Sequence, residues 1–252
     1  MKHKFLFILL FSLVLEGMVA TQAVAGDYVH QVNTLIGTKG TGLTSGYLYP
    51  GATYPYGMVQ FTPSYFSKRS GFVINQLSGG GCEHMGNFPT FPVKGKLKMS
   101  PDNILNYRIS VSEEKGHAGY YEAMVQEDIK AKLTVTERTG MASYEYPADQ
   151  QYGTIIIGGG ISATPIEQAA IVITAPNKCE GYAEGGNFCG LRTPYKVYFV
   201  AEFDTDALET GTWKREELMP NTTFAEGEYS GVYFTFDVNK KKNIQYKIGV
   251  SY

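Results

Sequence analysis

The stretch "IKAKLTVT" at residues 129–136 indicates the fold class of this chain. Apolar and polar residues alternate through it, from Ile129 and Lys130 to Val135 and Thr136. A repeat of two residues places the apolar side chains on one face of an extended strand and the polar ones on the other. Residues 129–136 are therefore expected to form a half-buried β-strand.

The same alternation recurs in three later segments. They lie at residues 197–203, 232–238 and 244–250. Turn-forming sequences separate them, including "AEGEYSG" before Val232 and "VNKKKN" before Ile244. Many short strands at this spacing predict an all-β protein, an antiparallel β-sandwich of two packed sheets.

Helix signals are weak, because 29 glycines and 11 prolines interrupt most of the windows long enough for a helix. The segment "TDALETGTWKREELMP" at residues 205–220 is expected to hold at most a turn or two of helix. "IIIGGGISA" at 155–163 matches a dinucleotide-binding spacing, but Thr164-Pro165 follows where a helix would have to begin. It is read as a strand that ends in a glycine turn. Residues 34–92 are expected to form long loops rich in Gly, Pro and Tyr.

The first 25 residues are expected to be a signal peptide. Lys2 and Lys4 precede the apolar run "FLFILLFSLVL", and the small residues Ala23-Val24-Ala25 form the expected cleavage site. That run is too short to span a bilayer, and no later segment is longer and equally apolar. We therefore expect an exported protein, periplasmic or extracellular, without a membrane span. Removing Lys2, Lys4 and Glu16 from 22 basic and 24 acidic residues leaves 20 and 23, so nucleic acid is not an expected partner.

Three cysteines enter an oxidising compartment if the chain is exported. A bridge between Cys179 and Cys189 would close a short glycine-rich loop, and two buried free thiols are the alternative. We expect the bridge, with Cys82 left free. Cys82 and His84 are too few for a zinc site and lack a third group that would make them a nucleophilic pair.

Reactive side chains are concentrated in "LSGGGCEHMGNFP" at residues 77–89. Its glycines would let the backbone approach a ligand closely. Cys82, Glu83, His84 and Asn87 supply polar groups beside Phe88, a composition suited to a sugar. The predicted substrate-binding residues are Gly81, Cys82, Glu83, His84 and Asn87.

Several motifs in order resemble one known family. They are "VNTLIGTKG", "YPGATYPYGMVQFTP", "RSGF", "LSGGGCEHMGNFP", "TVTERTGMASYEYP", "YKVYFVAEFD" and "YKIGVSY". Together they resemble the N-terminal domain of glycoside hydrolase family 92, a family of exported α-mannosidases. The resemblance extends from about Val32 to Tyr252. Two departures are "GFVINQLSG", where many members have a longer histidine-containing segment, and Glu83-His84, where an Asp-Tyr pair is common.

The resemblance implies that residues 26–252 are a β-sandwich domain. In the family it precedes a large (α/α)6 catalytic domain, which is missing from this sequence. Inverting hydrolysis needs two carboxylates, and these and the calcium ligands come chiefly from that second domain, so no catalytic or metal residue is assigned here. No cofactor is expected in this chain, and calcium is expected in the complete enzyme. The implied partners are a mannose-containing glycan and the missing catalytic domain.

The leading hypothesis is a carbohydrate-binding, cleft-forming domain of a truncated or split enzyme, inactive alone. One alternative is a small self-sufficient glycosidase that uses Glu83 with a second carboxylate, such as Asp102, Glu113 or Asp128. Another alternative is a stand-alone carbohydrate-binding or adhesion sandwich.

Overall fold

The structure is a computed structural model that describes residues 28–38, 48–64, 71–82, 84–104 and 110–252. The predicted signal peptide and the side chain of Glu83 lie outside these residues. The chain divides into two compact units, residues 1–31 and residues 32–252. In the first unit the structure describes a short 3-10 helix, η1 (Val29–Gln31). The second unit contains all of the strands.

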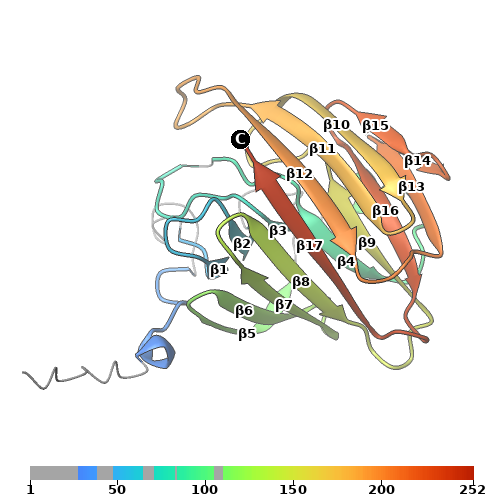
Figure 1. The fold of residues 1–252 in the computed structure, drawn as a ribbon, viewed down its shortest axis with the longest axis horizontal. Helices are drawn as coiled ribbons and strands as arrows, with labels where there is room; N and C mark the ends of the chain where they lie inside the picture. Colours follow the sequence, from blue (N-terminus) through green and yellow to red (C-terminus); the bar gives the residue numbers. More distant parts are fainter. Residues whose placement is uncertain (1–27, 39–47, 65–70, 83, 105–109) are drawn as a thin grey trace, which may run out of the picture. The chain divides into compact units, whose positions relative to one another are not determined.

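One sheet of this unit has eight strands in the spatial order β1-β2-β3-β4-β9-β16-β13-β14 (Figure 1). The strands are β1 (Ala52–Thr53), β2 (Gln60–Pro63), β3 (Phe72–Val73), β4 (Thr90–Lys94), β9 (Tyr152–Gly158), β16 (Ser230–Asp237), β13 (Glu209–Lys214) and β14 (Glu217–Pro220). All neighbouring strands pair antiparallel.

The other sheet has nine strands in the order β15-β10-β11-β12-β17-β8-β7-β6-β5. The strands are β15 (Phe224–Glu226), β10 (Ile166–Ala175), β11 (Lys178–Gly185), β12 (Tyr195–Phe203), β17 (Asn243–Ser251), β8 (Thr139–Glu145), β7 (Ile129–Val135), β6 (Tyr120–Val125) and β5 (Val111–His117). Their pairing is also antiparallel throughout. The predicted all-β class and two-sheet sandwich are therefore confirmed.

The inner faces of the two sheets meet in a core rich in aromatic rings. Phe203 of β12 lies with its ring centroid 4.7 Å from that of Phe234 and 5.1 Å from that of Phe236, both on β16. Tyr246 of β17 donates a hydrogen bond of 2.7 Å from its hydroxyl to Thr90 Oγ1 of β4. These contacts join strands of opposite sheets, because the alternating apolar residues of each strand point inward.

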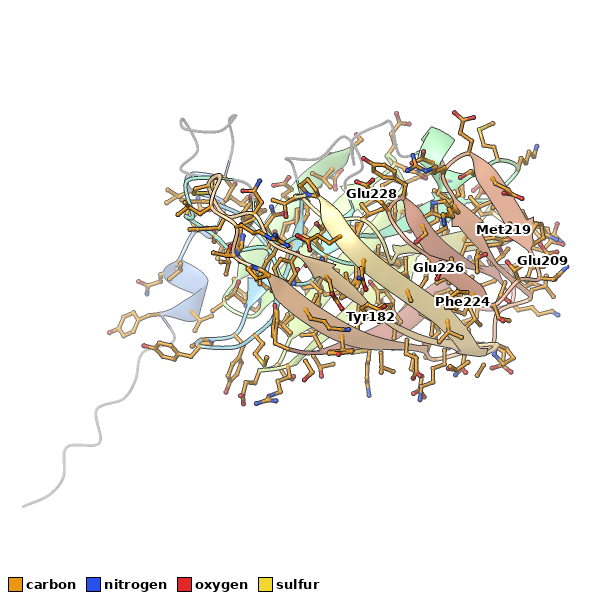
Figure 2. All side chains as sticks on the ribbon, turned by 90° about the horizontal axis from the view of Figure 1, so that it is seen from above. Tyr182, Glu209, Met219, Phe224, Glu226 and Glu228 are labelled. Atoms are coloured by element: carbon orange, nitrogen blue, oxygen red, sulfur yellow. A yellow bond between two sulfur atoms is a disulfide. The ribbon has the colours of Figure 1, made fainter. Side chains whose placement is uncertain are left out.

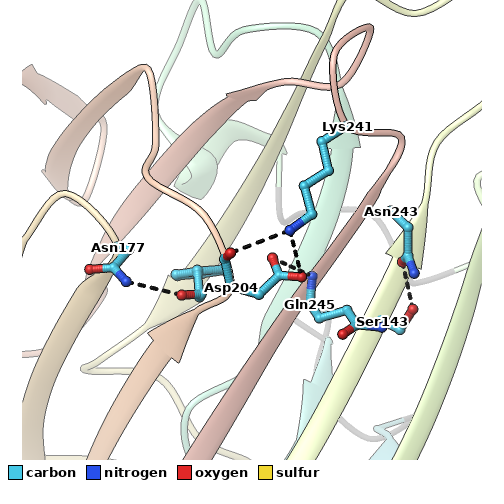
Figure 3. A network of polar contacts seen from close by, with 7 residues as sticks. Ser143, Asn177, Asp204, Lys241, Asn243 and Gln245 are labelled. Atoms are coloured by element: carbon cyan, nitrogen blue, oxygen red, sulfur yellow. Dashed lines mark hydrogen bonds and ion pairs between the residues drawn. The ribbon is translucent and has the colours of Figure 1, made fainter.

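A polar network around Asp204 lies on the surface at one end of the sandwich (Figure 3). Its carboxylate forms an ion pair of 2.8 Å with Lys241 Nζ and accepts a hydrogen bond of 3.2 Å from the backbone N–H of Gln245. Lys241 belongs to the predicted turn "NKKKN" between β16 and β17. The network therefore ties this turn to the end of β12.

Two local expectations were incomplete. Residues 205–220 hold the hairpin of β13 and β14, where at most a turn or two of helix was expected. Residues 34–92 include the short strands β1 to β3 and the start of β4 as well as loops. In both segments, pairing with neighbouring strands stabilises extended backbone that the local sequence marks only weakly.

Helix is scarce in the described part of the chain. The α-helix α2 covers only Pro101–Ile104. None of the helices described here has the length and hydropathy needed to cross a bilayer.

Candidate functional site

The glycine-cysteine loop at residues 77–89 connects β3 to β4 at one end of the sandwich. Gly79, Gly81 and Gly86 have φ angles of 74°, 76° and 74°, in the left-handed region that favours glycine. A Cβ atom added at Gly81 would meet nothing within 4 Å. The exposed front of the loop therefore presents bare backbone.

A disulfide joins this loop to the loop between β11 and β12. It links Cys82 to Cys189, which are 107 residues apart in sequence, and Cys179 is a free, buried cysteine. The predicted Cys179–Cys189 bridge, with Cys82 free, was therefore wrong.

The reason is the position of Cys179 on β11. Its side chain is 0% exposed and points into the core, opposite Ala201 of β12. From Cys179 to Gly185 the strand runs extended, so six steps carry the chain about 20 Å away before the loop begins. Cys189 is beyond the reach of Cys179, and the two cysteine-bearing loops meet at the same end of the sandwich.

The disulfide holds His84 against the β11–β12 loop. His84 is 8% exposed, and its ring meets the ring of Phe188 edge-on at 4.5 Å between centroids. Burial lowers the pKa of His84, and a hydrogen bond to the backbone of Asn187 opposes that shift. His84 is therefore a largely neutral, packed histidine near neutral pH.

Asn87 is the centre of a buried hydrogen-bond network. Its backbone N–H donates to Asn75 Oδ1 at 2.7 Å, and its own Oδ1 accepts from Asn75 Nδ2 at 3.0 Å. The Tyr195 hydroxyl at the start of β12 donates to the same Oδ1 at 3.0 Å. This network fixes the end of the loop where the chain enters β4.

The chain terminus joins the same network. Asn75 Nδ2 also donates to the Tyr252 hydroxyl at 3.2 Å, and that hydroxyl donates to Met85 Sδ at 3.9 Å. Tyr252 follows β17, so three chain segments far apart in sequence converge here, and Figure 1 shows the C-terminus near the β11–β12 loop. The network anchors the loop to the nine-stranded sheet.

Four buried polar atoms of this cluster have no hydrogen-bond partner among the residues that the structure describes. They are His84 Nδ1, Asn87 Nδ2, Gln76 Nε2 and Gln76 Oε1. Gln76 is 1% exposed and borders Gly86, where an added Cβ would lie 3.4 Å from Gln76 Oε1. Such atoms are rare in native proteins and invite a ligand or an ordered water.

The structure thus brings three predicted residues together: Cys82 in the disulfide, His84 against Phe188 and Asn87 in the network. Gly81 lies exposed beside them, and Glu83 is outside the described residues. Contact of these residues with a sugar stays a prediction.

Sequence reasoning missed the residues that support the loop. They are Asn75, Gln76, Phe188, Tyr195 and Tyr252. The segment "NQLSGGGC" carried a hint for Asn75 and Gln76, because two amides precede the glycines. Nothing local marked the other three.

The carboxylates considered for a self-sufficient glycosidase lie elsewhere. Asp128 forms an ion pair of 2.9 Å with Lys94, at the far end of β4 and about 13 Å along the strand from Thr90. Asp102 lies in α2, where its N–H bonds Ser100 Oγ at 3.2 Å. Glu113 lies on β5.

Among the described residues no three His, Cys, Asp or Glu side chains lie close enough together to hold a metal ion. No metal ligand is therefore assigned in this part of the chain.

The chain is similar to known glycosidases. The sequence profile described as "Glycosyl hydrolase family 92 N-terminal domain" matches residues 31–251. A relative from Arthroderma benhamiae, called an uncharacterized secreted glycosidase, is 30% identical over 159 residues, with 54% of this chain and 20% of the relative covered.

Solved structures share the fold. The family GH92 glycosyl hydrolase ccman5 superposes with a TM-score of 0.75 at 21% identity, covering 89% of this chain and 32% of that one. The α-mannosidase BT3965 from Bacteroides thetaiotaomicron, in complex with mannoimidazole, gives 0.73 at 24% identity, covering 88% and 32%. The inverting mannosidase BT2199 of the same organism gives 0.69 at 22% identity, covering 89% and 31%.

The chain therefore spans about a third of the length of these structures. The family profile matches well over half of the chain and agrees with the fold. On this evidence the chain belongs to the glycosyl hydrolase family 92 N-terminal domain family.

Proposed function

We propose that this chain is the carbohydrate-binding, cleft-forming N-terminal domain of a secreted, calcium-dependent, inverting α-mannosidase. The observation that carries the proposal is the family match over residues 31–251. The mannosidases among its structural neighbours support the substrate class, a mannose-containing glycan. The function of this chain is to bind and frame the sugar rather than to cleave the glycosidic bond.

The loop at residues 77–89 has properties suited to that role. Gly79 and Gly81 expose backbone that a hydroxyl-rich ligand can approach, and the Cys82–Cys189 disulfide limits how far the loop can move. The unpartnered buried atoms belong to His84 and Asn87 of the loop itself and to Gln76, which directly precedes it. A small rearrangement of the loop would let sugar hydroxyls pair with these atoms, which removes the cost of leaving them unbonded.

Bond cleavage is assigned to a second, (α/α)6 domain of the whole enzyme. Inversion needs an acid and a base roughly 6.5 to 9.5 Å apart across the sugar. Asp102, Glu113 and Asp128 are borne by three separate elements outside the loop and do not form such a pair around it. Because the described residues hold no group of three His, Cys, Asp or Glu side chains for an ion, the metal is proposed for the second domain, and no step in this chain depends on it.

Export is part of the same proposal. The amino-terminal sequence has the charge, apolar run and small residues of a signal peptide. The relative from Arthroderma benhamiae is described as secreted. A periplasmic or extracellular site would also keep the Cys82–Cys189 bridge oxidised.

Binding can be tested by nuclear magnetic resonance on the chain labelled with nitrogen-15. Titration with α-1,2-mannobiose should shift the amide signals of Gly79, Gly81 and Asn187, with weak, millimolar affinity. Cellobiose serves as the matched control ligand and should leave these signals in place. Shifts confined to other parts of the chain would contradict the proposed site.

Catalysis is tested with a fluorogenic α-mannoside. The chain alone, with calcium supplied, should release no fluorophore. A separately expressed family 92 catalytic domain that lacks its own sandwich should gain activity when the chain is added. In that mixture Glu83→Ala or His84→Ala should lower the rate more than Glu113→Ala, since only the first two change the loop.

Turnover by the chain alone that disappears in the Glu83→Ala variant would overturn the proposal. It would show instead a self-sufficient glycosidase.

A further inference from the structure

The outer face of the nine-stranded sheet carries a group of apolar residues that point away from the core. Strand register places them in two rows across β15, β10, β11 and β12. One row contains Ala170, Tyr182 and Tyr198, and the next contains Phe224, Val172 and Val200. Opposite residues in a ladder share a face, so both rows point away from the core. We call these six residues the aromatic face.

The surface of the aromatic face is hollowed. A cavity of about 390 Å³ lies over β10, β11 and β12 and includes Tyr182, Tyr198 and Phe224 in its lining. A second hollow of about 530 Å³ follows over β12, β17 and β8. Val200 lines both, so the two hollows are adjacent.

Two aromatic rings stand at the ends of the first hollow. Phe224 is 53% exposed and Tyr198 is 46% exposed, on strands three intervals apart, a span of about 14 Å. Phe224 and Tyr182 are labelled in Figure 2 on the same side of the sheet. Between these two aromatic rings the lining includes Ala170, Val172 and Gly181, whose side chains are small enough to leave room for a ring of a ligand. The span of about 14 Å between Phe224 and Tyr198 suits a ligand with several rings in a row better than a ligand with one ring.

The ring of Tyr182, on the strand β11 between β10 and β12, is held in place by a neighbouring cation. The Lys196 ammonium lies 4.0 Å from the centroid of the Tyr182 ring and 5.3 Å from that of Tyr198. Glu184 holds this ammonium by an ion pair of 2.5 Å. Lys196 thus fixes the two tyrosines, whose centroids are 6.0 Å apart, and leaves an N–H donor at the edge of the hollow.

Glutamates alternate with the apolar residues of this face. Glu180 lies between Val172 and Val200 in the second row, and Glu226 lies opposite Ala170 in the first. Glu202 lines the adjoining hollow. The centres of protein–protein interfaces are depleted of glutamate and lysine, so this composition does not favour a protein partner. Carboxylates beside aromatic rings suit a ligand with apolar ring faces and many hydroxyl donors.

We propose that the aromatic face binds a neutral, linear oligosaccharide across the strands, at a site separate from the loop at residues 77–89. Pyranose rings stack on Phe224 and Tyr198, and hydroxyls donate to Glu180 and accept from Lys196. The faces of a pyranose ring are apolar and its edges are polar. This pattern matches the aromatic rings of this face, which have Glu180 and Lys196 beside them. The proposal goes beyond the mannose contact of the loop and does not depend on it.

Isothermal titration calorimetry on the purified chain tests this site with mannohexaose, cellohexaose and xylohexaose. At least one should bind. Tyr198→Ala and Phe224→Ala should each weaken that binding about tenfold or more, because each removes one stacking surface. Tyr54→Ala is the matched control, since Tyr54 is 49% exposed and outside the face, and it should leave the affinity unchanged.

Tyr198→Ala and Phe224→Ala should leave the amide shifts of Gly79, Gly81 and Asn187 with α-1,2-mannobiose unchanged, which separates this site from the loop. Thermal melts of every variant establish that each one is folded. The proposal is overturned if none of the three oligosaccharides binds, or if Tyr198→Ala and Phe224→Ala change the affinity less than twofold. It is also overturned if the chain dimerises and Tyr198→Ala abolishes the dimer, since a second copy would then cover the face.

Discussion

Removal of the Cys82–Cys189 bridge should cost this chain a large part of its stability. The bridge closes a loop of 107 residues, so its loss frees much of the unfolded chain. Loop-closure entropy for about 100 residues corresponds to about 4.7 kcal/mol, and native bridges in small domains typically contribute about 2 to 5 kcal/mol. We expect the Cys82→Ser/Cys189→Ser double variant to lose about 4 kcal/mol in free energy of unfolding.

The assay is urea denaturation followed by tryptophan fluorescence. Trp213 is the single tryptophan and is 0% exposed, so its emission reports loss of the core. The melting temperature should fall by roughly 10 to 15 °C for a domain of this size. Cys179→Ala is the matched control, because it removes a buried sulfur without opening a bridge and should cost only about 1 kcal/mol.

Two results would refute this reasoning. Non-reducing peptide mapping could find Cys179, rather than Cys82, linked to Cys189. Alternatively, the double variant could lose no more stability than Cys179→Ala, which would mean that the bridge does not constrain the unfolded chain.

Three further predictions concern the pH response, the core and processing. Because burial lowers the pKa of His84, the unfolded chain takes up its proton first, so stability should fall as pH drops below about 6.5. Urea midpoints should show a flatter slope over that range for His84→Asn, and an unchanged slope contradicts the assignment. Gly231→Ala should cost about 3 kcal/mol, because its Cβ would lie 2.1 Å from the Trp213 ring, whereas Gly249→Ala, with its nearest atom at 3.7 Å, should cost under about 1 kcal/mol in the same assay. The exported chain should begin at Gly26 on N-terminal sequencing, and a start beyond Tyr28 would be inconsistent with the proposed cleavage site.

The strand pattern of this protein was readable from sequence because one face of each long strand is buried. The alternation from Ile129 to Val135 became β7, and the three later segments became parts of β12, β16 and β17. "IIIG" became the end of β9, Gly159 and Gly160 follow it, and the next element is a strand and not a helix. A repeat of two residues is a local property, so it survives without knowledge of the partners.

The candidate site was only half predictable, because it depends on contacts between distant segments as well as on local sequence. Glycines, Cys82, His84 and Asn87 marked the loop, because their chemistry is visible in one short stretch. The partners Asn75, Phe188, Tyr195 and Tyr252 come from other segments, and nothing near them in sequence shows that they meet.

Sequence alone determined the fold class, the family and the loop that is proposed as the sugar site. Only the tertiary structure decided which cysteine pairs with Cys189, because strand β11 carries Cys179 into the core while two distant loops converge. It also decided that Tyr182, Tyr198 and Phe224 share one outer face, since that depends on strand order and register. The alternation of apolar and polar residues depends on neighbours along the chain. The pairing of cysteines and the set of residues that share one outer face depend on neighbours in space.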